Sequence, residues 1–143
     1  MKTVARLLQA KGQEVWSVQP DHSVFEALEL MARKNCGALL VLDPGGALAG
    51  IFSERDYARK VILVGKASKD TPVGDIMSSE VVTVAPGQSV QDCMALMTDK
   101  RVRHLPVVEE GEIVGIISIG DVVKAVISEQ EFVIEQLEKY ITH

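Results

Sequence analysis

The chain contains the same segment twice. Residues 15–62 and 81–127 align in register, apart from one deletion near Pro44. A repeat of this length is one supersecondary unit that cannot cover its own apolar face. Two copies packed face to face would close one core and leave a pair of related clefts, so the repeat predicts a binding function located between the halves. Matching residues include Val15 and Val81, Pro20 and Pro86, Val41 and Val107, Gly50 and Gly115, and Ile62 and Ile127.

The composition is consistent with one compact domain and argues against several functional classes. Of the 143 residues, 47% are apolar and only 4% aromatic, so we expect an aliphatic core. The net charge of −5 argues against general binding to nucleic acids or anionic membranes. No apolar run is long enough to span a membrane, and the N-terminal residues are too polar for a signal peptide. These observations predict a cytoplasmic protein.

Each repeat is expected to be ordered strand, helix, strand, strand, helix. β-branched runs predict the first strand, and a serine followed three places later by a carboxylate, at Ser23 and at Ser89, predicts the start of the first helix. Two further apolar runs joined by a glycine-containing turn predict a hairpin that passes directly into the last helix at Ser53 or Ser118. The expected strands are 15–18, 38–42 and 48–52 in the first repeat, and 81–84, 105–108 and 113–117 in the second.

A similar leader segment precedes each repeat, at Thr3–Leu8 and at Thr71–Met77. Thr71 stands before a proline, which predicts a helix N-cap followed by proline at the first helical position. The order along the chain then predicts an α+β protein with four parts. These are a first repeat with its leader (3–64), a connector (65–70), a second repeat with its leader (71–128) and an amphipathic terminal helix (129–143).

The most specific pattern is Gly50–Asp56, which recurs as Gly115–Asp121. A serine three residues before an aspartate is itself a capping box, so both copies can be purely structural. Alternatively, a strand that runs into a helix aims several free N–H groups at one place. There a serine hydroxyl can donate to phosphate, an aspartate can accept both hydroxyls of a ribose, and the glycine can let a ligand approach the backbone. The residues alone leave both interpretations open.

Basic residues favour the phosphate interpretation, although a solvated surface charge is the alternative for each of them. Arg55 lies inside the first motif, whereas the second has Gly120 at the equivalent position. Arg103 and His104 immediately precede the strand at 105–108, where the first repeat has glycine and alanine. Because the arginine side chain matches the geometry of phosphate, these differences predict two related but unequal sites.

The sequence does not indicate an enzyme or a metal site. It contains no Ser/His/Asp set, no paired histidines with metal-ligand spacing, no CxxC motif and no phosphate-cradling GxxxxGK loop. Cys36 and Cys93 fall in expected helices without metal-ligand spacing, so we interpret both as small core residues.

Together these motifs resemble the cystathionine-β-synthase (CBS) domain, here as a tandem pair. The resemblance rests on the doubled unit, the Ser-Val after each proline, the Arg-His-Leu-Pro-Val-Val run at 103–108 and the two Gly-h-h-Ser-x-x-Asp ends. It covers the chain from about Thr3 to Ser128 and is closest in kind to stand-alone CBS-pair proteins. The resemblance implies a pseudo-twofold symmetric pair of repeats.

The resemblance also implies a non-catalytic regulatory module that binds an adenine nucleotide, such as AMP, ATP or NAD(H), in clefts between the repeats. In the family the motif serine meets phosphate and the aspartate holds ribose, which points to Ser53 and Asp56 and to Ser118 and Asp121. The base is expected against Ser17, Val18, Gly37 and Ala38, and against Thr83, Val84, Leu105 and Pro106. Arg103 and His104, with Arg55 as a further candidate, are expected to reach phosphate.

The family further implies a homodimer formed through helices, with the terminal helix contributing here. No nucleic acid and no membrane is expected as a partner. One alternative is a ligand-free dimerisation adaptor whose apolar helices recruit a protein partner. A nucleotide hydrolase is a third alternative with the least support.

Overall fold

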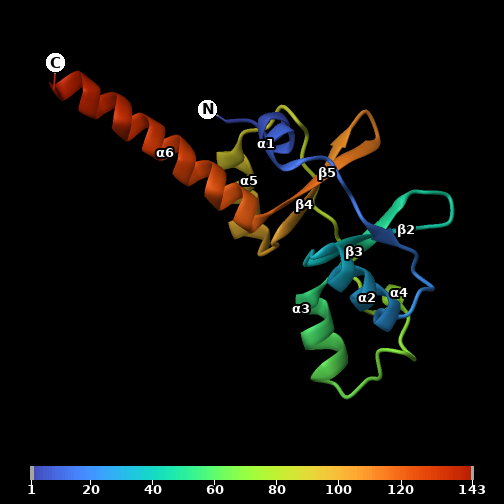
Figure 1. Cartoon of the computed structure of the whole chain (residues 1–143). Helices are drawn as coiled ribbons and strands as arrows, with labels where there is room; N and C mark the ends of the chain where they lie inside the picture. Colours follow the sequence, from blue (N-terminus) through green and yellow to red (C-terminus); the bar gives the residue numbers. More distant parts are fainter. Residues whose placement is uncertain (1, 143) are drawn as a thin grey trace. The chain divides into compact units, whose positions relative to one another are not determined.

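A computed structural model describes residues 2–142 and divides the chain into two compact units (Figure 1). The repeat-1 unit is Val15–Val81, and the repeat-2 unit combines the residues up to Glu14 with those from Val82 onward. Each unit has a hydrophobic core of its own, where the sequence led us to expect one core shared by both repeats. The face-to-face packing of the repeats with pseudo-twofold symmetry stays a prediction.

The repeat-1 unit confirms the expected order of strand, helix, strand, strand, helix. Its sheet has the order β1-β2-β3, with β1 parallel to β2 and β2 antiparallel to β3. The last helix of the repeat is a short α-helix that continues as a π-helix. The elements are β1 (Ser17–Val18), α2 (Val24–Lys34), β2 (Ala38–Leu42), β3 (Leu48–Ser53), α3 (Glu54–Tyr57), η1 (Ala58–Ile62) and α4 (Val73–Ile76).

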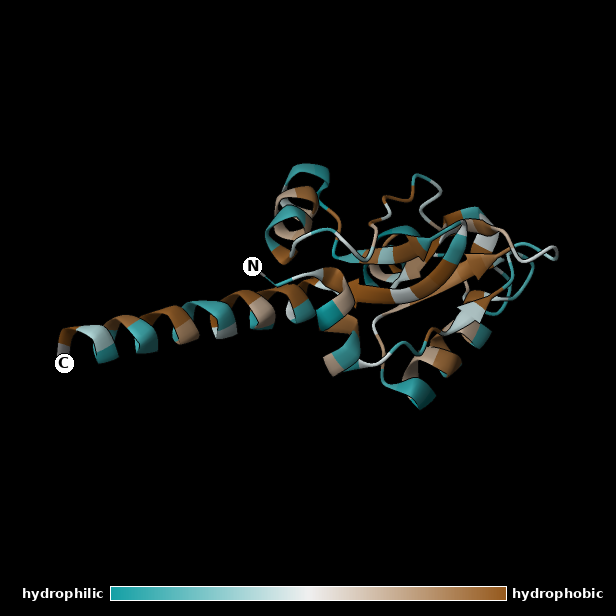
Figure 2. Cartoon of the chain, turned by 90° about the horizontal axis from the view of Figure 1, so that it is seen from above, coloured by the Kyte–Doolittle hydropathy of each residue, from teal (hydrophilic) through white to brown (hydrophobic). Residues whose placement is uncertain are grey.

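The repeat-2 unit contains an antiparallel pair of strands, β4 and β5, with helices α1, α5 and α6. The terminal helix expected from residue 129 is continuous with the helix that follows Ser118, and together they form α6. Hydrophobic residues recur along the whole length of this 24-residue helix (Figure 2). The elements are α1 (Val4–Lys11), α5 (Val90–Lys100), β4 (His104–Glu109), β5 (Glu112–Ser118) and α6 (Ile119–Thr142).

The strand expected at 81–84 is wrong, because only one residue of it pairs. Val84 donates its N–H to Pro106 O and accepts from Val108 N–H, and the rest of the run is irregular. In the repeat-1 unit the equivalent strand gains a further bond, from Leu40 N–H to Trp16 O. Pro106 occupies the position of Leu40 and has no N–H to donate, so the strand cannot extend.

The serine caps of α2 and α5 are confirmed. Ser23 Oγ accepts the N–H of Glu26 at 3.1 Å, and Ser89 Oγ accepts the N–H of Asp92 at 3.0 Å. At the other end of α2, Asn35 adopts a left-handed conformation (φ 52°) that terminates the helix. Cys36 therefore lies beyond the helix, contrary to expectation. Cys93 lies within α5, where burial raises the pKa of its thiol to about 11.

The leader segments pack with the repeats in the reverse of chain order. The α1 leader joins the repeat-2 core, with Val4 N–H bound to Gln88 O and Val90 N–H bound to Lys2 O. The α4 leader joins the repeat-1 core, where Val73 N–H binds His22 O. From the sequence we had grouped each leader with the repeat that directly follows it in the chain. Contacts between distant segments leave no local trace in the sequence, which explains the difference.

The start of α4 also differs from expectation. Pro72 is itself the capping residue, in an extended conformation (φ −69°, ψ 145°), and the helix begins one residue later. Thr71 is buried, and its hydroxyl donates to Ala67 O at 2.8 Å instead of capping the helix. The first helical N–H, that of Val73, is already bound by His22 O, so it has no need of the threonine oxygen.

Candidate functional site

In the repeat-1 unit, the junction between β3 and α3 is a complete capping box. Ser53 N–H donates to Asp56 Oδ2 at 3.0 Å, and Asp56 N–H donates to Ser53 Oγ at 3.3 Å. The Ser53 hydroxyl also lies 3.1 Å from the same carboxylate oxygen. The structural interpretation of this motif is therefore confirmed, and any ligand-binding role comes in addition to it.

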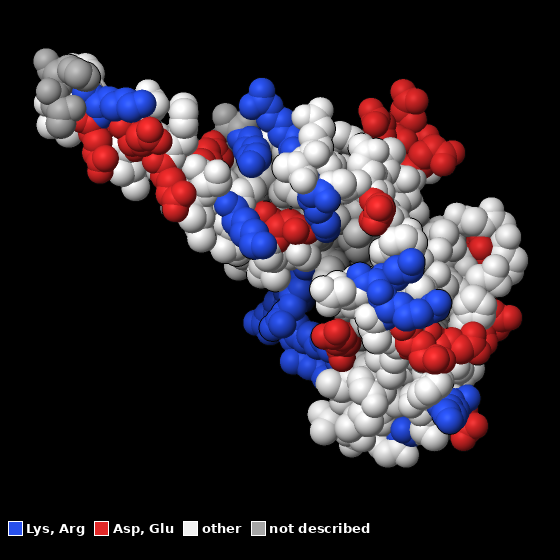
Figure 3. All heavy atoms as spheres, in the orientation of Figure 1, with Lys and Arg blue, Asp and Glu red and all other residues white. Residues whose placement is uncertain are grey.

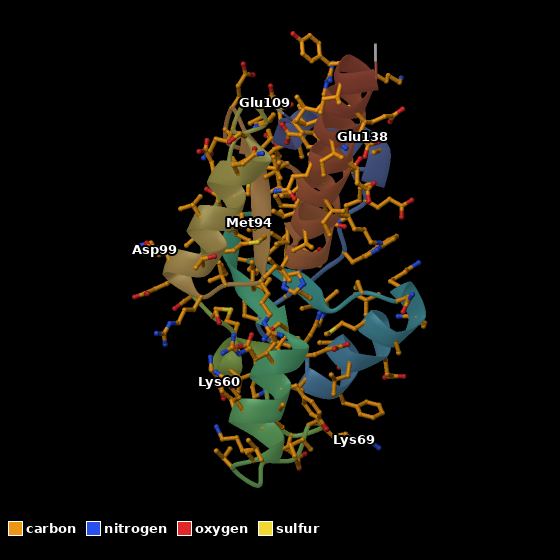
Figure 4. All side chains as sticks on the ribbon, turned by 90° about the vertical axis from the view of Figure 1, so that its left-hand side faces the viewer. Lys60, Lys69, Met94, Asp99, Glu109 and Glu138 are labelled. Atoms are coloured by element: carbon orange, nitrogen blue, oxygen red, sulfur yellow. The ribbon has the colours of Figure 1, made fainter. Side chains whose placement is uncertain are left out.

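The second oxygen of Asp56 is also occupied. Ser78 Oγ donates to Oδ1 at 3.2 Å, and Lys60 Nζ lies 3.4 Å from it. Ser78 arrives there because it pairs with Ile51 in an antiparallel bridge, and Lys60 projects from η1 (Figure 4). Asp56 is only 8% exposed, and a buried carboxylate requires such partners. A ligand hydroxyl would have to displace one of them.

The equivalent junction in the repeat-2 unit is more open. Ser118 N–H donates to Asp121 Oδ2 at 2.8 Å, and Asp121 N–H donates to Ser118 Oγ at 3.2 Å. Lys11, the last residue of α1, donates to the same Oδ2 at 2.5 Å and to Ile116 O at 2.7 Å. Within the part of the chain that the structure describes, no group donates to Oδ1 of Asp121, whose side chain is 23% exposed.

The electrostatics of this junction keep Asp121 charged. Partial burial acts to raise the pKa of its carboxyl, but the hydrogen bonds and positive charge of Lys11 and the hydrogen bonds from Ser118 outweigh that effect. The pKa of Asp121 is therefore lower than usual. An ionised carboxylate with one open oxygen can accept a hydrogen bond from a hydroxyl group.

In each unit, the residue just before the hairpin accepts a hydrogen bond, through its carbonyl oxygen, from the first N–H of the helix that follows the hairpin. In the repeat-1 unit Glu54 N–H donates to Gly37 O at 3.1 Å, and Ala38 pairs with Ser53 across the sheet. Arg55 follows in the first turn of α3. The structure therefore brings together the predicted residues Gly37, Ala38, Ser53, Arg55 and Asp56 at one end of the β2–β3 hairpin.

The repeat-2 unit has the same arrangement with different side chains. Ile119 N–H donates to Arg103 O at 2.8 Å, and His104 pairs with Ser118 across the β4–β5 hairpin. Arg103 is exposed and His104 is half-buried. This hairpin end combines an arginine, a histidine, a serine and an aspartate, so it presents both a carboxylate and groups that suit an anion.

The predicted residues of the first strands lie beside these hairpin ends. Ser17 pairs with Leu40, two residues beyond Ala38 on β2, and the backbone of Val84 is bonded to Pro106. Ser17 and Thr83 are exposed. The side chains of Val18, Val84 and Leu105 are buried in the cores, and Pro106 is also buried. A ligand at this edge would therefore meet the backbone of the buried valines and leucine instead of their side chains.

The surroundings of the two motif glycines favour the structural interpretation of the motif. A Cβ on Gly50 would lie 2.7 Å from Ser78 O, and a Cβ on Gly115 would lie 2.7 Å from a Leu8 methyl carbon. The space beside each glycine is therefore taken by a leader segment of the chain itself. The absence of a side chain serves internal packing at both positions and does not open the backbone to a ligand.

The comparison with known proteins agrees with this geometry. The family model described as CBS domain matches residues 12–63 and 73–128. The chain belongs to the CBS domain family. A mitochondrial CBS domain-containing protein from Arabidopsis thaliana, CBSX3, is 43% identical over 148 residues, which cover 97% of this chain and 71% of that protein.

Solved CBS structures share the fold. The CBS-domain containing protein ATU1752 from Agrobacterium tumefaciens is 42% identical, with a TM-score of 0.82 over 86% of this chain and 92% of that one. A hexameric CBS-CP12 protein from bloom-forming cyanobacteria is 28% identical, with a TM-score of 0.77 over 85% of this chain and 66% of that one. CBS pairs are regulatory modules that often bind adenosine-containing ligands.

Sequence reasoning missed three polar residues of this CBS pair. Lys60 could have been found, because it lies four residues after Asp56 on the same helical segment. Ser78 and Lys11 could not, because Lys11 ends α1 and Ser78 follows α4. No local pattern shows that α1 packs on repeat 2 and α4 on repeat 1. These three residues decide how accessible each aspartate is.

Two general features of the CBS pair can be stated for the described residues. Between residues 2 and 142, no helix combines the length and hydrophobicity needed to cross a membrane. Over the same residues, no group of three or more histidine, cysteine, aspartate or glutamate side chains is placed to hold a metal ion.

Proposed function

We propose that this CBS pair is a non-catalytic regulatory module that binds an adenine nucleotide, such as AMP, ATP or NAD(H). One observation carries the proposal. The same Ser-x-x-Asp junction occurs in both units, where a hairpin runs into a helix, and in the repeat-2 unit it keeps an ionised carboxylate with an open oxygen. Membership of a family that often binds adenosine-containing ligands supports it.

The chemistry of the repeat-2 junction matches the parts of a nucleotide. Asp121 Oδ1 can accept a hydrogen bond from a ribose hydroxyl, because Ser118 N–H and Lys11 both donate to the other oxygen, Oδ2. Arg103 and His104 stand at the start of β4, next to Ser118, and can bind phosphate oxygens. The exposed Thr83 and the backbone at Val84 and Pro106 offer an edge for the base.

The repeat-1 junction is the weaker site in this proposal. Ribose could bind Asp56 only by displacing Ser78 or Lys60 from Oδ1. The loss of that existing interaction reduces the net free energy of binding. Arg55 is the compensating feature, because the repeat-2 unit has Gly120 in its place. We therefore expect nucleotide to occupy the repeat-2 junction first. The location in clefts between the repeats stays a prediction.

Calorimetric titration tests the proposal with a matched control. AMP, ATP, NAD(H) and S-adenosylmethionine are titrated into the wild type and into Asp121→Asn and Asp92→Asn variants. Both substitutions remove the charge of a capping aspartate, but only Asp121 is proposed to meet a ligand. Loss of a charge-assisted hydrogen bond should lower the affinity for the preferred ligand by about 10- to 100-fold in Asp121→Asn. The affinity of Asp92→Asn should equal that of the wild type.

The opposite result is equally clear. If none of the four ligands binds the wild type, or if both variants bind them as tightly as the wild type does, the nucleotide proposal fails. Far-UV circular dichroism of both variants shows whether a loss of binding reflects unfolding.

The alternative function, a ligand-free adaptor that recruits a protein partner, is favoured by a specific observation. Both aspartates are already engaged in caps and ion pairs, and α6 exposes a large apolar surface. In this case Asp56→Asn and Asp121→Asn would leave partner binding intact, and the calorimetric titrations would show no heat of nucleotide binding.

We also propose that the chain is a homodimer in the cytoplasm. A CBS-CP12 relative is hexameric, so self-association occurs among proteins of this fold. Sedimentation equilibrium measures the assembly, with a dimer expected and a monomer at all concentrations contradicting it. The cytoplasmic location stays a prediction, because one relative is mitochondrial, and cell fractionation would test it.

A further inference from the structure

The second half of α6 has no covering element within its unit. The first half packs on α5 and α1, but every residue from Gln130 to Ile141 is exposed. This stretch includes Ile134, Leu137 and Ile141, which are 54%, 56% and 79% exposed. An isolated helical segment of this length is only marginally stable in water, so a second surface is needed to hold it.

Five of the nine exposed large apolar residues of α6 have heptad spacing. Ile127, Ile134 and Ile141 recur every seven residues and occupy the a positions. Gln130 and Leu137 occupy the d positions between them, and Val123 occupies the d position before Ile127. This spacing keeps one continuous seam on one side of the helix, and at a rise of about 1.5 Å per residue the seam is roughly 27 Å long.

We propose that α6 pairs with α6 of a second copy of this chain, as a parallel, in-register, two-stranded coiled coil through this seam. The proposal specifies where the homodimer proposed above is joined and does not depend on nucleotide binding. Isoleucine at a with leucine at d, as at Leu137, favours two parallel strands.

The charges on α6 select the parallel direction. The e positions that follow the first two a isoleucines are Glu131 and Glu138, and the g positions are Val126, Val133 and Tyr140. In an antiparallel pair the e positions face each other, so glutamates would repel. In a parallel pair each e glutamate lies beside an apolar g residue of the other helix. Figure 3 shows the acidic side chains along α6.

The exposed area is sufficient for a stable dimer. The seam and its g positions include seven apolar side chains that are about 40 to 80% exposed. Together they present on the order of 700 Å², close to the roughly 800 Å² that each partner contributes to a standard interface. These side chains are Val123, Ile127, Val133, Ile134, Leu137, Tyr140 and Ile141.

A polar layer lies in the middle of the seam. Gln130 and Glu129 line a surface crevice of about 330 Å³ with Gln91, Val133 and Ile134. Gln91 donates to Glu129 at 2.9 Å, but its Oε1 is buried and finds no donor among the described residues. A single amide in an apolar seam also fixes the register of two strands.

Disulfide cross-linking tests the direction and register. In a Cys36→Ser background, a parallel in-register pair places residue 137 beside its own copy, so Leu137→Cys should form a disulfide-linked dimer under mild oxidation. Lys139→Cys is the matched control, because residue 139 is exposed on the opposite side of the same turn. It should not cross-link. Cys93 is buried and present in both variants.

Sedimentation equilibrium supplies an independent measurement. Ile134→Glu should weaken self-association at least about 10-fold, whereas Phe132→Glu, on an equally exposed residue outside the seam, should leave it unchanged. Equal cross-linking of residues 137 and 139, no cross-linking of either, or equal effects of the two glutamates would overturn the inference. A dimer that survives with such results would leave the homodimer proposal standing and place its interface elsewhere.

Discussion

The two Ser-x-x-Asp junctions share one backbone design but differ in what surrounds the carboxylate. Asp56 is enclosed by Ser78 and Lys60, so both of its oxygens are bonded. Asp121 is held by Lys11 on one side only. The comparison shows that the motif alone determines the helix cap, whereas the leader segment packed against it determines whether an oxygen remains for a ligand.

The helices that follow explain why the lysines come from different places. Lys60 lies in η1, one turn beyond Asp56, but its counterpart in α6 is the buried Ala125. The repeat-2 unit therefore takes its lysine from α1. The π-helical turn in η1 has no equivalent in α6, and such turns are frequent at functional sites.

The largest expected effect concerns the packing of the leaders. Leu8 of α1 is buried in the repeat-2 core against Gly115. Leu8→Ala should lower the free energy of unfolding by about 2–5 kcal/mol. Hydrogen exchange should show faster opening of α5, β4 and β5. Leu63→Ala, at a residue 76% exposed, is the control and should change stability by less than about 0.5 kcal/mol. Faster exchange confined to the repeat-1 unit would refute the pairing of α1 with repeat 2.

A second comparison separates the two motif glycines. A Cβ on Gly50 would meet backbone oxygen Ser78 O, whereas on Gly115 it would meet the movable end of Leu8. Gly50→Ala should therefore cost more stability than Gly115→Ala, within the range of about 1–3 kcal/mol for overpacking. Gly120→Ala, with nothing closer than 3.7 Å, is the control and should be neutral or stabilising. Urea denaturation measures all three, and the reverse order for Gly50 and Gly115 would contradict the packing.

The local parts of this structure could be predicted from the sequence, and the distant pairings could not. The caps at Ser23, Ser53, Ser89 and Ser118 depend on residues three positions apart, so spacing alone reveals them. The packing of α1 on repeat 2 and of α4 on repeat 1 depends on contacts between distant segments, which no local sequence pattern encodes. The incorrectly predicted strand at 81–84 lies between these two cases. The sequence shows that Pro106 has no N–H, but it does not show that residues 81–84 would have to pair with the strand that contains Pro106.

The smallest expected effect is a dependence on pH. The pKa of Asp121 is lowered in the folded chain, so its contribution to stability is present above the unfolded pKa and is lost as pH falls through the folded pKa. Lys11→Met should reduce stability at pH 7 by about 1 kcal/mol or less. The difference from the wild type should shrink in acid, below the usual carboxylate range. Thermal unfolding across pH measures this, and a difference independent of pH would contradict the ion pair.

The most direct measurement is a nuclear magnetic resonance titration of the labelled chain with AMP, ATP or NAD(H), following the backbone amides of both junctions. We expect the amides of Ser118, Gly120 and Asp121 to shift at the lowest nucleotide concentrations, before those of Ser53 and Asp56. Shifts that begin at Ser53 and Asp56, or that spare both junctions while nucleotide binds, would contradict it.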